Sequence, residues 1–143
     1  MPIRTLVYAS QTAETVTAIR IRRIVADAAV FNELAGVTGL LLYDGGRFLQ
    51  YLEGPQDGVD AVFKRVLAST SHLEIVELAR GVVGERLLPY WPMTLVHAES
   101  NVLGRLTSSD WNGFVRRGPA RPTAVDHLLA VAEQHRLNPP AVG

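Results

Sequence analysis

The sequence predicts an α+β fold in which strands and helices follow the order β-α-β-β-α-β-β. Two observations lead to this prediction: runs of alternating apolar residues that are typical of strands, and intervening segments whose apolar residues recur at helical spacing. This order, with a right-handed crossover for each helix, gives a mixed sheet with two helices on one face. We therefore expect a ferredoxin-like fold with an added strand and a C-terminal helical extension.

The composition excludes several classes of protein. The chain has 143 residues, of which 48% are hydrophobic, so it can bury the core of one domain. Its fourteen basic and fourteen acidic residues are scattered, so no charged surface points to nucleic acid or an anionic membrane as a partner. Cysteine is absent, which excludes disulfides, iron–sulfur clusters and thiol chemistry. No apolar run approaches the ~20 residues of a membrane span. We expect a cytoplasmic protein.

Five strands are expected, at residues 3–10, 37–43, 47–53, 73–82 and 93–97. The second and third form a hairpin, because Asp44-Gly45-Gly46 between them supplies the positive φ that tight connections require. We expect these two strands to be central in the sheet.

Two helices are predicted between the strands. The first carries Ile21, Val25 and Ala28 at helical spacing and ends near Gly36, a residue suited to a left-handed cap. The second begins after Gly54-Pro55, because proline is favoured at the start of a helix.

The C-terminal part of the chain is less regular. A short helical turn is expected within residues 101–110, and a helix over residues 123–137. Thr123 and Asp126 resemble a capping box at the start of that helix. The helix has an apolar stripe that must be buried. The bare face of the sheet is the expected place, and a partner protein is the alternative.

Three uncharged polar side chains are expected on apolar surfaces. Gln50 shares a strand face with Phe48 and Leu52, Tyr8 lies on an apolar face of the first strand, and Asn32 continues the apolar stripe of the first helix. A buried polar group without a partner would cost roughly 2–7 kcal/mol. One interpretation is that the three bond one another and trap a water. The other is that they converge on a cleft for a flat heterocycle with alternating N–H and C=O groups.

Five separated segments are informative together: LVYAS, Asn32 followed by GVTGLLLYDGG, RFLQYLEGP, a basic helix residue before SH, and PYWPM. In order and spacing they resemble the BLUF family of blue-light-sensing flavin domains, over about residues 3–96. The resemblance implies a flavin-binding domain in residues 1–98, in which the isoalloxazine ring of FAD lies between the two helices. Residues 99–143 would form a helical extension that packs on the sheet.

The resemblance also implies roles for individual residues. Tyr8 looks like the photoactive tyrosine, and Gln50 like the switching glutamine that bridges this tyrosine and the flavin. Asn32 looks like the asparagine that holds the carbonyl and imide edge of the ring. Arg65 looks like the helix residue that contacts the ring from the far side.

Trp91 and Met93 look like the pair in the last strand that exchange places near the glutamine. The resemblance therefore implies a light switch without net chemistry, not an enzyme. Its signal would pass through the last strand and the C-terminal helices to a separate regulator protein. We expect a homo-oligomer without an attached effector domain, because the chain ends soon after Leu137.

The sequence departs from the family pattern at Gln11, Phe31 and Ser69-Thr70-Ser71-His72. Each departure removes a charge that could contact the cofactor, which keeps FMN and riboflavin as alternatives to FAD. One rival interpretation is a ferredoxin-like domain that binds a small ligand or hydrolyses acyl or phosphoryl groups with Arg65 and Asn32, although the sequence offers it no evident nucleophile. Another is a binding module that has lost its affinity for flavin.

The remaining ionisable residues are expected to be structural or solvated. The four histidines, His72, His97, His127 and His135, show no metal-ligand spacing. Glu53 and Glu74 are expected at a solvated sheet edge rather than as a catalytic pair.

Overall fold

A computed structural model of the chain describes residues 2–12, 17–69, 72–89, 91, 93–117 and 120–137, without the side chains of Ala18 and His72. The regular elements follow the predicted order, with two further helices and a short 3₁₀ helix, η1, at the C-terminal end. They are β1 (Ile3–Thr12), α1 (Ala18–Leu34), β2 (Thr38–Tyr43), β3 (Arg47–Gly54), α2 (Gln56–Ala68), β4 (His72–Val83), β5 (Thr94–His97), α3 (Ser100–Ser108), η1 (Asn112–Phe114) and α4 (Ala124–Leu137).

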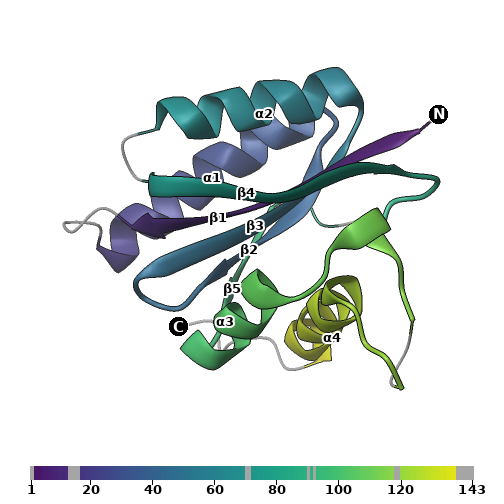
Figure 1. The fold of residues 1–143 in the computed structure, drawn as a ribbon. Helices are drawn as coiled ribbons and strands as arrows, with labels where there is room; N and C mark the ends of the chain where they lie inside the picture. Colours follow the sequence, from purple (N-terminus) through teal and green to yellow (C-terminus); the bar gives the residue numbers. More distant parts are fainter. Residues whose placement is uncertain are drawn as a thin grey trace.

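The five strands form one mixed sheet in the order β4-β1-β3-β2-β5. β3 lies at its centre, and β2 pairs with β3 in an antiparallel and with β5 in a parallel manner. Helices α1 and α2 cover one face, and α3 and α4 lie on the other (Figure 1). The predicted ferredoxin-like fold with its C-terminal helical extension is confirmed.

Alternation along the strands sends side chains into two separate cores. The first, here called the α1/α2 core, lies between the sheet and helices α1 and α2 and includes Leu6, Phe48 and Leu52. The second, here called the α3/α4 core, lies on the opposite face and includes Val7 and Leu49. Because side chains alternate along a strand, one run of residues contributes to both cores.

Glycines end α1 and turn the hairpin as predicted. Gly36 follows the end of α1 with a φ of +74°, and Gly45 lies in the β2–β3 connection with a φ of +102°. Residues with a Cβ rarely adopt either conformation.

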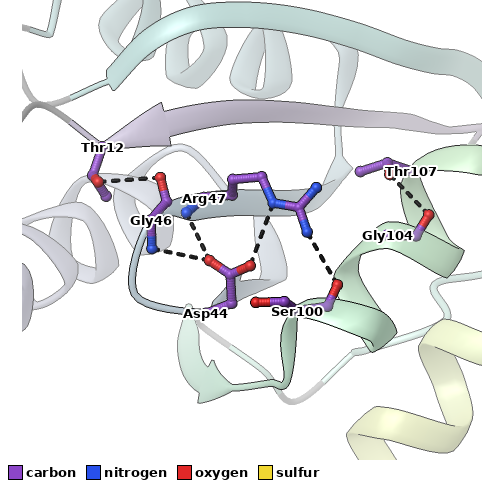
Figure 2. A network of polar contacts seen from close by, with 7 residues as sticks. All are labelled: Thr12, Asp44, Gly46, Arg47, Ser100, Gly104 and Thr107. Carbon is purple, nitrogen blue, oxygen red and sulfur yellow. Dashed lines mark hydrogen bonds and ion pairs between the residues drawn. The ribbon is translucent and has the colours of Figure 1, made fainter.

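Arg47, held by Asp44, joins this hairpin to the C-terminal extension (Figure 2). The carboxylate of Asp44 accepts hydrogen bonds from the backbone N–H groups of Gly46 at 2.9 Å and Arg47 at 2.8 Å, and from Nε of Arg47 at 3.3 Å. Arg47 also donates from Nη2 to the backbone carbonyl of Ser100, at the start of α3, at 3.0 Å. Burial opposes ionisation, but the hydrogen bonds from Gly46, Arg47 and Ser100 prevail and lower the pKa of Asp44.

The described part of the C-terminal extension contains a longer first helix than the sequence suggests. The expected short turn is a nine-residue helix, α3. At the start of α4, Asp126 N–H donates to Oγ1 of Thr123 at 3.2 Å, and Thr123 N–H donates to the Asp126 carboxylate at 2.9 Å, which confirms the capping box. The apolar stripe of α4 is buried on the sheet, through Val125, Leu128 and Ala132.

The last strand is shorter than predicted. It begins at Thr94, so Trp91 and Met93 lie in the segment before it rather than within it. Backbone pairing nevertheless extends beyond the strand, because Gly39 N–H donates to the carbonyl of Trp91 at 2.8 Å. Within the described ranges, none of the helices has the length and hydropathy that crossing a membrane requires.

Candidate functional site

A pocket of about 180 Å³ opens between α1 and α2, above the sheet. Its apolar wall comes from α1, α2 and β2. Its polar groups come from α1, α2, β3 and the residue that follows α2. The lining residues are Ile24, Val25, Asp27, Ala28, Asn32, Leu41, Gln50, Val62, Arg65, Val66, Ser69 and Met93.

Gln50 occupies the floor of this pocket, in the middle of β3. Its side chain is 4% exposed, and its amide Nε2 donates a hydrogen bond to Sδ of Met93 at 3.3 Å. Thioether sulfur is only a weak acceptor, so this bond satisfies the amide less well than an oxygen would. The sequence placed Gln50 on an otherwise apolar face of the strand, and that face forms the floor of the pocket.

Asn32 reaches the pocket from the last turn of α1. Its side chain is 1% exposed, and among the described residues Nδ2 has no hydrogen-bond partner. Leaving such a donor unsatisfied costs about 1–3 kcal/mol. The backbone carbonyl of Asn32, by contrast, accepts from Val37 N–H at 2.8 Å. The side-chain amide therefore presents to the pocket a buried donor that has no acceptor among the described residues.

Tyr8 lies directly beside Gln50 in the sheet. The two residues are paired across the β1–β3 register, and the Tyr8 side chain is fully buried. Its ring contacts the ring of Phe63, with the centroids 5.6 Å apart. Burial raises the pKa of the Tyr8 phenol well above its usual range.

Arg65 lies at the mouth of the pocket, on the solvent side of α2. Its side chain is exposed, and its guanidinium carbon lies 4.6 Å from the centre of the Phe31 ring. A cation over an aromatic face is favourable by roughly 0.5–1 kcal/mol at an exposed site. Phe31, one of the departures from the family pattern, thus holds Arg65 at the edge of the pocket.

Met93 and Trp91 face opposite sides of the sheet. Met93 is 5% exposed and belongs to the α1/α2 core, where it lines the pocket. Trp91 packs on the α3/α4 core, with its ring 6.0 Å from the ring of His135 on α4. Two residues apart on a regular strand would share a face, but the segment before Thr94 is not a regular strand.

The expectation for Glu53 is wrong. Its side chain is completely buried, and its carboxylate accepts hydrogen bonds from Tyr51, Thr38 and the backbone of residues 87 and 88. Leu87 and Leu88, in the connection between β4 and β5, cover this end of β3, so Glu53 is shielded from solvent. Glu74, in contrast, is exposed.

No group of three or more histidines or carboxylates that could hold a metal ion occurs within the ranges the structure describes. Thr70, Ser71 and the side chain of His72, which belong to the expected departures, lie outside those ranges. Ser69 lines the pocket. The pocket thus offers two side-chain amides, a thioether and an apolar wall, which suit the edge and the faces of a flat heterocycle. The Tyr8 phenol is not among the lining residues and lies behind them, beside Gln50 in the sheet.

Comparisons with known proteins agree on one family. Residues 3–94 match the family described as BLUF, sensors of blue-light using FAD. The blue light- and temperature-regulated antirepressor BluF of Escherichia coli is 34% identical over 76 residues, which are 53% of this chain and 19% of that protein. Photoactivated adenylate cyclase subunit beta of Euglena longa is 30% identical over 93 residues, 64% of this chain and 11% of that protein.

A solved structure extends the likeness over most of the chain. The dark-state structure of BlrB, a BLUF protein, has a TM-score of 0.71 and 26% sequence identity, and the match covers 92% of this chain and 96% of that one. The curated relatives, in contrast, are matched over less than a fifth of their own lengths. The chain belongs to the BLUF family of flavin-binding blue-light sensors.

Proposed function

We propose that residues 1–98 hold FAD in the pocket between α1 and α2, and that Tyr8, Gln50 and Met93 convert blue light into a movement of the chain next to β5. The observation that carries the proposal is the arrangement of Gln50, which lies beside Tyr8 in the sheet and donates to Met93 at 3.3 Å. When bound, the flavin supplies absorption of blue light and, once excited, a strong oxidant next to the phenol.

The pocket residues divide the binding of the ring between them. The Nδ2 donor of Asn32 would meet a ring carbonyl, and the apolar side chains of α1 and α2 would cover the two faces. Ligand sites commonly measure about 300–1,000 Å³, so a pocket of about 180 Å³ suits the ring system rather than a whole dinucleotide. The tail of FAD would leave past Asp27, Arg65 and Ser69 at the mouth. FMN and riboflavin share the same ring and are the alternatives.

Gln50 can act as a switch because its amide has a donor on one side and an acceptor on the other. In the structure the donor, Nε2, faces Sδ of Met93. Rotation of the amide by half a turn would place Oε1 against the sulfur, and two acceptors cannot bond. Met93 would then lose its contact, and the segment that leads into β5 would be free to move.

Further proposals concern the output. BLUF domains are photoreceptors rather than enzymes, and the cyclase activity named for the Euglena longa relative belongs to that protein. We infer that this chain signals through β5 and the extension in residues 99–143 to a separate regulator protein, as a homo-oligomer in the cytoplasm. Trp91 supports this route, because it joins the segment before β5 to α4 through His135.

The proposal is tested with the purified chain and a Tyr8→Phe variant. The wild type is expected to carry a flavin, identified as FAD after release by heat, whose absorption shifts to the red under blue light. Tyr8→Phe keeps the buried ring and is expected to bind flavin without the shift. A Tyr8→Phe variant that still shifts would contradict the role of Tyr8, and a wild type that refuses added flavin would contradict the proposal as a whole.

A further inference from the structure

Glu53, at the end of β3, has a completely buried carboxylate that lies outside the pocket. Oε1 accepts from the Tyr51 hydroxyl at 2.7 Å and from Leu87 N–H at 2.8 Å. Oε2 accepts from Leu88 N–H at 2.7 Å and from the Thr38 hydroxyl at 3.3 Å. Buried carboxylates are rare unless their acceptor sites are filled in this way.

Two of these donors are backbone groups of the connection between β4 and β5. Arg86, in the same connection, donates to the hydroxyl of Thr38 at 2.9 Å and to the backbone carbonyls of Gly36 at 2.7 Å and Glu53 at 3.3 Å. The connection is therefore fastened to the ends of β2 and β3 at one place. Side chains and backbone both contribute, and all the bonds converge around Glu53.

A short series of hydrogen bonds leads from this place to the pocket. The carbonyl of Leu88 accepts from Trp91 N–H at 3.3 Å, and the carbonyl of Trp91 accepts from Gly39 N–H of β2 at 2.8 Å. Met93 follows, with its sulfur 3.3 Å from Nε2 of Gln50. Gln50 therefore contacts Met93 directly, and the bonds that start at Glu53 hold the chain as far as Trp91, two residues before Met93.

We propose that Glu53 is a positioning residue for the light switch: its carboxylate fastens Leu87 and Leu88 so that Met93 lies against Gln50 in the dark. The inference rests on the proposed function, because the role of Met93 in the light switch is part of that proposal. Movement of Met93 away from a rotated Gln50 would pull on the connection, so the bonds to Glu53 favour the return to the dark arrangement.

The methionine content offers a direct test, because the sequence has only two methionines, Met1 and Met93. With methyl-¹³C methionine in the flavin-bound full chain, the Met93 methyl signal reports its position by NMR in the dark. Glu53→Gln keeps the size of the side chain but turns one acceptor oxygen into an NH₂ group, which cannot accept from Leu87 or Leu88. We expect the Met93 signal of Glu53→Gln to shift or split and that of Met1 to stay unchanged.

Leu106→Ala is the matched control. Leu106 is completely buried in the α3/α4 core on α3, so its truncation lowers the thermal midpoint without removing a bond to the connection. The Met93 signal should stay in place in this variant. An unmoved signal in Glu53→Gln, or an equal shift in Leu106→Ala, would overturn the proposal.

Hydrogen exchange on the wild type provides a test that needs no variant. The amides of Leu87 and Leu88 are expected to exchange far more slowly in the dark than the amide of exposed Glu85, and roughly tenfold faster under blue light than in the dark. Exchange in the dark as fast as that of Glu85 would refute the fastening by Glu53. A wild type whose flavin absorption does not shift in light would refute the proposed function instead. The NMR test of the Met93 position in the dark would still stand.

Discussion

Nε2 of Gln50 donates a hydrogen bond to Sδ of Met93 at 3.3 Å, and both side chains are buried. This bond links the central strand of the sheet, β3, to the segment that leads into the edge strand, β5. It is a weak bond, because sulfur is a poor acceptor, and it depends on which way the amide points. A contact of this kind can be made and broken by a small rotation without disturbing the core around it.

Met93→Leu is expected to keep the fold but to slow the return from the light state. The substitution roughly conserves volume, so the free energy of unfolding should fall by less than about 1.5 kcal/mol. Gln50 loses its acceptor, which removes about 1 kcal/mol of stabilisation from the dark state. Return from the light state to the dark state would therefore slow by up to roughly fivefold. Recovery is followed by flavin absorption after a blue pulse. Ile75→Leu, in the same core but on β4, is the control, and equal recovery in both variants would speak against a role for the sulfur.

Asn32→Leu is expected to stabilise the protein without flavin and to weaken flavin binding. Removal of a buried donor that has no partner among the described residues should raise the free energy of unfolding by about 1 kcal/mol. Loss of the same donor from the binding site should raise the dissociation constant for FAD about tenfold. Denaturation and flavin titration of the same apo-protein measure the two effects. Asn101→Leu, on an exposed face of α3, should leave flavin affinity unchanged, and an unaltered affinity in Asn32→Leu would contradict the role of Asn32.

Asp44→Asn is expected to destabilise the chain in a pH-dependent way. The pKa of Asp44 is lowered in the folded state, so its charge stabilises the fold above the unfolded pKa of about 3.9, and this contribution is lost as the pH falls through the folded value. The difference in unfolding free energy from wild type, about 1–2 kcal/mol, should be constant above about pH 5 and shrink below about pH 4. Denaturation at several pH values measures it. Asp60→Asn, at an exposed position of α2, is the control, and a difference that grows in acid would exclude this account.

Leu128→Ala tests the packing of α4 on the sheet. Leu128 is completely buried in the α3/α4 core, so the variant should lose about 2–5 kcal/mol of unfolding free energy. Leu137, at the end of the same helix, is 62% exposed, and Leu137→Ala should change stability by less than about 0.5 kcal/mol. Urea denaturation distinguishes the two. Equal effects of the two substitutions would mean that α4 does not pack on the sheet in solution.

Local pattern was enough to predict much of the fold and part of the site. Alternation placed Tyr8 and Gln50 each on an apolar face of its own strand, and helical spacing extended the stripe of α1 to Asn32. These are short-range regularities of the backbone. The strand register then pairs Tyr8 with Gln50, and the pocket brings Asn32 to the same place.

What the sequence did not reveal depends on contacts between distant parts of the chain. Glu53 lies on the correct face, but whether that face is solvated depends on a connection that starts more than thirty positions later and folds over it. Trp91 and Met93 could not be assigned to opposite faces, because a two-residue spacing predicts the same face on a strand and the chain is irregular there. Neither the burial of Glu53 nor the opposite orientation of Trp91 and Met93 produces a periodic pattern in the sequence.

An absorption spectrum of the purified chain, recorded in the dark, under blue light and again in the dark, tests the central claim most directly. The wild type is expected to show a flavin band that shifts to the red in light and returns in the dark. Gln50→Glu is expected to show the flavin band without the shift, because a carboxylate cannot exchange a donor for an acceptor by rotation. A wild-type flavin band that stays in place under blue light, or a shift that survives in Gln50→Glu, would contradict the proposed switch.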